Sequence, residues 1–165
     1  MGCGAGTLTH ELVASGAFAR VVGVDTSREM LERARRRVRG ADFVIGNGID
    51  LHRLSLGHVD VAIAAFVAHE MPRSAHRRLL RGMHRAAPHG VLVLVDIAPT
   101  YVPSTPMLMG EPFVQAYIQT VVQTVEEEAA RLDRRVERET LLPGHVEMWA
   151  LTPANHTRPS EAPQL

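Results

Sequence analysis

The chain begins MGCGAGTLTHELVASGAFARVVGVD over residues 1–25, and this stretch decides the fold. It contains three glycines at alternate positions, Gly2, Gly4 and Gly6. Segment 7–15 then has apolar residues at helical spacing, and the apolar run 21–24 ends in Asp25, as in a buried parallel strand. A glycine-rich loop that opens a helix lets a ligand approach the backbone, and the free N–H groups there favour an anion. The stretch therefore predicts an α/β fold with a ligand site at the loop.

The rest of the chain alternates between strand patterns and helix patterns. Strands are expected over 41–46, 59–67 and 91–97, and helices over 26–39, 72–87 and 113–132. Residues 98–110 contain three prolines and are expected to form a loop, and 136–142 and 145–152 two closing strands. Such alternation predicts a Rossmann-like, doubly wound, mostly parallel sheet, and the last two strands, with no helix between them, form an antiparallel C-terminal hairpin.

Composition limits the class of protein. The 165 residues are 45% hydrophobic and 22% charged, which suits one globular domain, expected over 1–152 and followed by a polar disordered tail over 153–165. No apolar run approaches the roughly 20 residues that cross a bilayer. The single cysteine, Cys3, rules out an intramolecular disulfide framework and is interpreted as a small filler in the loop. Eighteen basic residues balance eighteen acidic ones, which gives no electrostatic case for nucleic acid.

Polar residues follow the strands that surround the glycine loop. In a sheet of this kind, ligands bind beyond the carboxyl ends of the strands. Asp25 follows Gly6 by 19 residues, and an acid there accepts hydrogen bonds from both ribose hydroxyls. Asn47 ends the next strand unit and can hydrogen-bond an adenine edge. The pattern predicts a pocket for an adenosine-containing cofactor; the alternative is a glycine turn with a capping aspartate.

The chain resembles the class I S-adenosylmethionine-dependent methyltransferases. The resemblance is carried by 2–6, 21–25, 42–47, 59–62, 90–96 and the hairpin around 143–146. It implies that the glycine loop faces the methionine end of the cofactor, that Asp25 holds the ribose and that Asn47, where the family usually has Asp, lies near the adenine. Phe66 lies at the same rim, which is the edge of the sheet formed by the carboxyl ends of the strands. The expected cofactor-binding residues are Gly2, Gly4, Gly6, Asp25, Asn47 and Phe66. The implied function is S-adenosyl-L-methionine-dependent methyl transfer to a small molecule in the cytoplasm.

Two segments are candidates for the acceptor side. His69 and Glu70 follow a strand that ends at the rim, and serve either as a general base or substrate contact, or to fix the start of the next helix. Tyr101, Met107 and Met109 lie in the expected loop and favour an apolar acceptor, unless they pack against the long helix. No catalytic residue is assigned, since the reactivity of a methyl sulfonium belongs to the cofactor and the protein supplies alignment.

Other functions are disfavoured by specific residues. A dinucleotide-dependent oxidoreductase would have a small residue where Thr7 stands, in the pattern G-x-G-x-x-G/A. The nine histidines show no metal-ligand spacing, so no metal is expected. The arginines of 33–39 and the acidic run 126–128 are interpreted as solvated helix faces.

The resemblance also implies that one strand is missing. The family places a strand before the glycine loop, between the strand ending at Asp25 and the strand ending near Phe66. Two explanations stay open: a longer true protein whose start was misassigned, or a genuine short relative whose flanking strands close together or receive a strand from another chain. We expect the 165-residue chain to bind S-adenosylmethionine weakly or not at all, and an extended one to bind it. A non-catalytic fragment or binding module is the alternative function.

Overall fold

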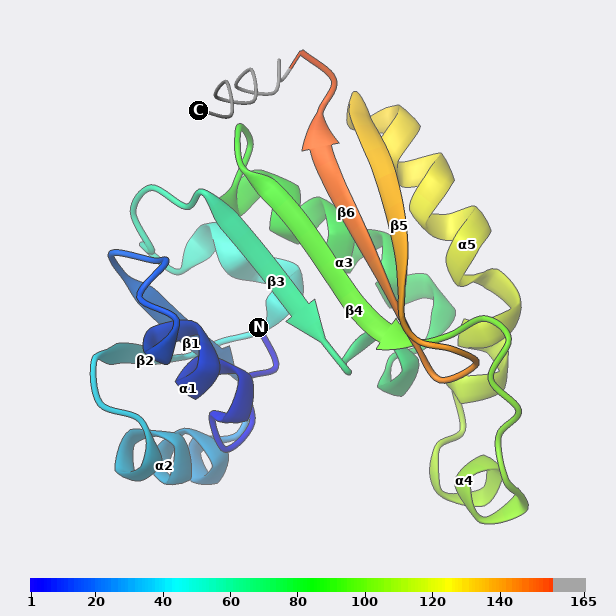
Figure 1. The fold of residues 1–165 in the computed structure, drawn as a ribbon, viewed down its shortest axis with the longest axis horizontal. Helices are drawn as coiled ribbons and strands as arrows, with labels where there is room; N and C mark the ends of the chain where they lie inside the picture. The colour runs from blue at the N-terminus through cyan, green and yellow to red at the C-terminus, as the bar shows by residue number, and fades with distance from the viewer. Residues whose placement is uncertain (156–165) are drawn as a thin grey trace, which may run out of the picture.

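The strands of the computed structural model, which describes residues 1–155, fall into two sheets (Figure 1). In the first, β1 (Val21–Asp25) pairs in parallel with β2 (Ala41–Ile45). The second has the order β3-β4-β6-β5: β3 (Val61–Ala65) and β4 (Val91–Ile97) are parallel, and β6 (Val146–Pro153) is antiparallel to β4 and to β5 (Arg134–Leu142). The α/β fold with parallel pairs and an antiparallel closing hairpin is confirmed. The strand expected at 59–67 is shorter and ends at Ala65.

Helices connect these strands at the places that the sequence predicts, with one addition. They are α1 (Thr7–Ala14), α2 (Arg28–Arg37), α3 (Arg73–Ala86), α4 (Thr105–Gly110) and α5 (Val114–Arg131), with 3₁₀ turns η1 (Gly48–Arg53) and η2 (Ala68–Glu70). The prediction of a loop throughout 98–110 was wrong, because α4 forms there. The hydroxyl of Ser104 accepts from the Met107 N–H, and a proline stands in the first turn. A serine cap followed by a first-turn proline is a helix-start signal that the sequence contained.

Helix α2 begins two residues later than the helix expected over 26–39. Its cap is Ser27, whose Oγ accepts from the Met30 N–H at 3.2 Å. Glu29 forms an exposed ion pair with Arg33 at 2.6 Å.

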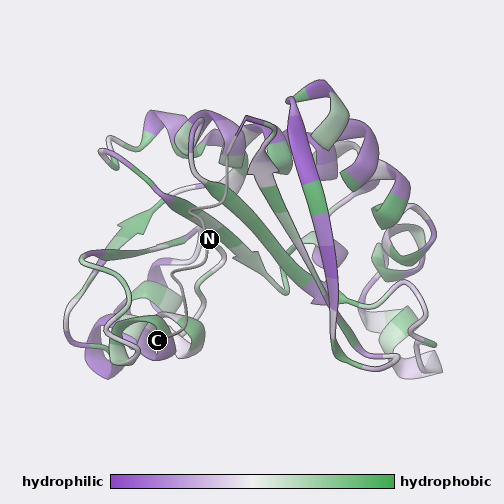
Figure 2. Cartoon of the chain, turned by 45° about the horizontal axis from the view of Figure 1, so that its top comes forward, coloured by the Kyte–Doolittle hydropathy of each residue, from purple (hydrophilic) through white to green (hydrophobic). Residues whose placement is uncertain are grey.

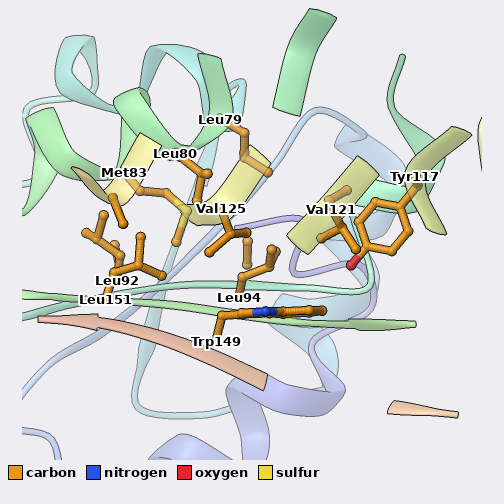
Figure 3. Close-up of a cluster of buried hydrophobic side chains, with 14 of the residues drawn as sticks. Leu79, Leu80, Met83, Leu92, Leu94, Tyr117, Val121, Val125, Trp149 and Leu151 are labelled. Carbon is orange, nitrogen blue, oxygen red and sulfur yellow. The ribbon is translucent and has the colours of Figure 1, made fainter. Parts of the chain in front are cut away.

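The main core lies between the four-stranded sheet and helices α3 and α5 (Figure 3). Its largest side chains come from both helices and from β4 and β6: Leu79, Leu80, Met83, Tyr117, Val121, Val125, Leu92, Leu94, Trp149 and Leu151. The helical spacing predicted for both helices is thereby confirmed. Figure 2 shows the apolar strands at the centre and the hydrophilic edge strand β5, whose charges discourage pairing with another chain.

Glu128 corrects the interpretation of 126–128 as helix surface. Its side chain is fully buried between α5 and α3. The carboxylate accepts from the guanidinium of Arg81 at 2.6 and 3.0 Å and from that of Arg131 at 2.7 Å. Burial by itself would raise the pKa of Glu128, but the two arginines outweigh it and hold the pKa below 4.5. Arg131 lies three residues further along α5, whereas Arg81 comes from α3, and the periodicity of a single helix does not reveal that second contact.

We expect Glu128→Gln to lower the free energy of unfolding by about 1–3 kcal/mol at neutral pH, because the arginines lose a charged acceptor. Since folding lowers the pKa of Glu128, its contribution is present above about pH 4.5 and is lost as the pH falls through the lowered value. Urea unfolding between pH 2.5 and 7 checks this. In Glu128→Gln the free energy of unfolding should fall less steeply as the pH is lowered. The control Glu126→Gln, which changes an exposed neighbour, should leave this pH dependence unchanged.

Helix α1 is less buried than its sequence suggests. Of its residues only Thr9 is buried, whereas Leu8, expected in an apolar stripe, is 40% exposed. Leu8 and Leu12 instead line a cavity between the two sheets. Among residues 1–155 no strand lies between β1 and β3, and the N-terminus of the chain is found there (Figure 1).

Candidate functional site

The glycine loop forms a tight turn at the carboxyl end of β1. The N–H of Cys3 donates to the Val24 carbonyl at 3.1 Å, and the N–H of Gly6 donates to the Cys3 carbonyl at 2.9 Å. Gly4 has φ +52°, and a Cβ built there would meet no atom within 4 Å. A Cβ at Gly2, by contrast, would lie 2.1 Å from Cγ2 of Val67. The loop therefore packs against the end of β3 at Gly2 and presents open backbone at Gly4.

Asp25 ties this loop to the start of α2. Its Oδ2 accepts from the Gly4 N–H at 2.8 Å, and its Oδ1 accepts from the Ser27 N–H at 2.8 Å. Each carboxylate oxygen can accept about two hydrogen bonds, so each retains capacity for a ligand hydroxyl. Asp25 is half-buried. It therefore shapes the loop and still offers acceptors at the rim.

Asn47 reaches the same rim from β2. The N–H of Gly46 donates to the Asp25 carbonyl at 2.9 Å, which places the residues after both strands side by side. Oδ1 of Asn47 accepts from the Ile49 N–H at 3.0 Å and caps η1, and the side chain is exposed. The amide oxygen that the sequence assigns to adenine thus also holds a turn.

Phe66 stands at the end of β3, across the gap from Asp25. It has φ +52°, a left-handed conformation that is uncommon for a bulky residue, and it is 48% exposed. Its N–H donates to the Val95 carbonyl at 2.9 Å, which fixes the turn. The strained backbone presents an aromatic ring at the rim, and such strain is found at ligand sites.

His69 lies between two carboxylates. Its Nδ1–H donates to Oδ1 of the fully buried Asp96 at 2.5 Å, and its Nε2 lies 3.5 Å from Oε2 of Glu111. Oδ2 of Asp96 also accepts from the Ala68 N–H at 2.9 Å, so this carboxylate fixes the whole η2 turn. Sequence reasoning selected His69, and it placed Asp96 at the carboxyl ends of the strands without assigning it a role. It also missed Glu111, which comes from the segment before α5.

The surroundings of His69 change its basicity. Burial by itself would lower the pKa of His69, but the hydrogen bond and charge of Asp96, together with Glu111 and Glu70, outweigh burial and raise it. Nε2 is the only ring nitrogen left to take up a proton, because Nδ1 is held by Asp96. The geometry suits a proton acceptor whose charged form is stabilised on both sides.

The other residues that the sequence offers for the acceptor side differ in how far they are buried. Tyr101 and Met107 pack against the core, and the Tyr101 ring meets His145 edge-on with centroids 5.7 Å apart. Met109 is 84% exposed, and Glu70 is exposed as well. Packing therefore accounts for Tyr101 and Met107, whereas Met109 is free to meet a ligand.

Cys3 is partly buried in the glycine loop. Burial, and then the charge of Asp25, raise the pKa of its thiol. The neutral form is favoured, which suits the interpretation of Cys3 as a filler.

Comparison with known families identifies the chain. Residues 1–90, which include the glycine loop, Asp25, Asn47 and His69, match the model of the methyltransferase domain family. The chain belongs to this family.

Individual relatives agree with the family. An uncharacterised methyltransferase of Synechocystis sp. is 36% identical over 96 residues, covering 58% of this chain and 44% of the relative. Carboxy-S-adenosyl-L-methionine synthase of Glaesserella parasuis is 32% identical over 102 residues, covering 58% of this chain and 42% of that protein. The chain thus spans less than half of the curated relatives that it matches. A solved S-adenosylmethionine-dependent methyltransferase from Mesorhizobium loti superposes with a TM-score of 0.64 at 19% identity, covering 91% of this chain and 87% of that one, which shows the shared fold.

The pKa of His69 in this methyltransferase domain is open to direct measurement. We expect its imidazole to titrate above 6.5 in an NMR pH titration, because two carboxylates stabilise the protonated ring. Asp96→Asn should move the midpoint to lower pH. Glu70→Gln, which removes a carboxylate that contributes less, should move it less. An unchanged midpoint in Asp96→Asn would contradict the assigned contact.

Proposed function

We propose that this chain is the catalytic core of an S-adenosyl-L-methionine-dependent methyltransferase that acts on a small molecule. The observation that carries the proposal is the carboxylate of Asp25, which holds the Gly4 N–H at 2.8 Å and keeps acceptor capacity at the rim. Family membership supports the same reaction. In this proposal the methyltransferase domain is the unit 1–152; the described part of 153–165 begins with the last strand residue, Pro153, and residues 156–165 lie outside the described residues.

The cofactor lies along the carboxyl edge of β1 and β2 in this proposal. The methionine end faces Gly2, Gly4 and Gly6, where Gly4 leaves the backbone open. The ribose hydroxyls donate to Asp25, and the adenine lies beside Asn47, whose Oδ1 has one further lone pair after capping η1. Phe66 closes the site from the other sheet. When bound, the cofactor supplies an electrophilic methyl group.

The acceptor side is proposed to take an apolar molecule that carries a proton-bearing oxygen or nitrogen. Exposed apolar residues occur after β3, after β4 and at the end of β5: Phe66, Val102, Leu108, Met109, Leu141 and Leu142. His69 takes the proton of the acceptor at Nε2, and Asp96 holds the ring in the correct tautomer. Tyr101 backs this surface through its contact with His145.

A binding module without activity is the second candidate, and the missing pairing between β1 and β3 is the observation that favours it. Cofactor binding and turnover together separate the two candidates. Among residues 1–155 the structure contains no helix long and apolar enough to span a bilayer. The proposal adds a cytoplasmic location and small molecules, rather than nucleic acid or membranes, as partners.

Gly4→Ala tests the cofactor site, with Gly16→Ala as the matched control. Both glycines are left-handed and neither Cβ would meet an atom within 4 Å, so both variants should lose a similar free energy of unfolding, about 1 kcal/mol. Only the methyl group added at position 4 would lie in the proposed cofactor site. Only Gly4→Ala should therefore weaken S-adenosylhomocysteine binding, by at least about 10-fold. Calorimetry on the 165-residue chain, and on the same chain with five apolar residues fused ahead of Met1, measures this. Absence of binding in both would contradict the proposed cofactor.

His69→Gln tests the proton acceptor. With a hydroxyl acceptor that the wild type methylates, we expect kcat to fall about 10²–10⁴-fold with little change in cofactor affinity, because general-base catalysis contributes about that much. The wild-type rate should rise with pH through the raised pKa of His69 and then level off. Transfer that proceeds at the wild-type rate in His69→Gln would leave His69 only a structural role.

A further inference from the structure

The chain between β4 and α5 is anchored at both ends and has little burial in between. Ala98 and Val114 are fully buried, whereas no residue of 99–113 is buried. Tyr101 and Met107 pack against the core with only part of their surface. Figure 1 shows that α4, the helix within this segment, projects away from the sheet beyond the end of β4. Since few apolar contacts hold the 99–113 segment, a single polar contact can decide its position.

Glu111 supplies that contact. It is the one charged residue in the sequence of 99–113. Its side chain is 37% exposed, but its Oε2 is buried and accepts no hydrogen bond within the described chain. This oxygen lies 3.5 Å from Nε2 of His69. A buried carboxylate oxygen without a hydrogen bond is unfavourable unless a cation faces it, so the contact depends on the charge of the imidazole.

The other ring nitrogen of His69 cannot change its role. Nδ1 lies 2.5 Å from Oδ1 of Asp96, which only accepts, so Nδ1 carries its hydrogen in both charge states of the ring. Asp96 is held in turn by the N–H groups of Ala68 and Ile97. Protonation therefore changes Nε2 alone. The charged ring presents an N–H to Glu111 and attracts it, whereas the neutral ring presents a lone pair to a carboxylate and repels it.

The groups that face His69 from the neighbouring elements leave it as the one whose charge changes near neutral pH. Three carboxylates favour the charged ring and together outweigh burial, so that its pKa is raised: Asp96 of β4, Glu70 of η2 and Glu111. From α5, the Tyr117 ring meets the imidazole edge-on with centroids 6.3 Å apart, and burial raises the pKa of its hydroxyl and keeps it neutral. Behind Tyr117, His76 of α3 is also held neutral, because burial lowers its pKa.

We propose that Glu111 is a latch that holds the 99–113 segment over His69 while the imidazole is protonated and releases it when the imidazole is neutral. The proposal rests on the proposed function, in which Nε2 of His69 receives the proton of the acceptor. Release then exposes Nε2 in the form that can accept a proton. Transfer of the acceptor's proton to Nε2 restores the attraction to Glu111, and loss of that proton to water resets the site. The latch ties access of the acceptor to the charge of the base.

Substitutions at position 111 test the latch through the hydrogen-bonded amides of Leu108, Glu111 and Val114. A helix as short as α4 persists only through its contacts, so release should lower the protection of these amides. Protection, measured as exchange relative to the intrinsic rate at each pH, is compared at about pH 5 and about pH 9, on either side of the ordinary imidazole pKa. In the wild type it should fall on the order of 10-fold at the higher pH.

The two variants should differ from the wild type in opposite ways. In Glu111→Gln, protection should be high at both pH values, because an amide donates to a neutral Nε2 and accepts from a charged one. In Glu111→Ala, protection should be low at both. By the same coupling, Glu111→Ala should move the NMR titration midpoint of His69 to lower pH, because the charged ring loses a carboxylate.

Glu70→Gln is the matched control. It removes a carboxylate that also favours the charged imidazole but belongs to η2, so the pH dependence of protection should remain. Amides of β4 should keep their protection in every variant, which reports that the fold is intact. Equal protection at both pH values in the wild type would overturn the proposal, as would a loss in Glu111→Gln as large as that in the wild type.

The exchange experiment contains neither cofactor nor acceptor, so its outcome is separate from that of the methyl-transfer assay. A wild type that methylates an acceptor but shows no pH-dependent protection would refute the latch alone. A pH-dependent segment in a chain that never transfers a methyl group would refute the proposed function and support the coupling between Glu111 and His69.

Discussion

The carboxylate of Asp25 is the contact on which the candidate site depends. It stands at the end of β1 and holds one backbone N–H on either side, that of Gly4 in the loop and that of Ser27 at the cap of α2. Together with the hydrogen bond from the Cys3 N–H to the Val24 carbonyl, it fixes the left-handed turn at Gly4 relative to the strand. Because both bonds use oxygens that can accept again, the same group that builds the site remains available to a ligand.

Asp96 repeats this arrangement on the other sheet. It ends the strand pattern of β4, is fully buried, and accepts from the Ala68 and Ile97 N–H groups as well as from His69. In both places an aspartate near the end of an apolar strand accepts hydrogen bonds from a neighbouring loop and fixes its position. The difference is burial: the exposed rim suits Asp25 to ligand hydroxyls, whereas Asp96 acts through the imidazole that it orients.

Most of the fold could be predicted because it rests on local patterns. The apolar runs of β1 and β4 and the helical spacing of Val121 and Val125 are visible in the sequence, and the structure agrees. What could not be predicted depends on contacts between distant segments. Glu128 looks like surface until Arg81 of another helix meets it, and Glu111 has no signal until its segment packs over His69. The proposed cofactor residues follow from the fixed spacing of the glycines and a strand-terminal aspartate, whereas acceptor residues have no such spacing.

The two halves of the proposed site lie on different sheets, so the chemistry depends on how the sheets are held together. Asp25 and Asn47 follow β1 and β2, while Phe66, His69 and Asp96 belong to β3 and β4. In residues 1–155 these sheets share no strand pairing, and the glycine loop connects them through Cys3 on Val24 and Gly2 against Val67. Alignment for methyl transfer tolerates little displacement between donor and acceptor. The contacts that residues 1–3 make with β1 and with the end of β3 therefore set the distance between the proposed cofactor half and the proposed acceptor half.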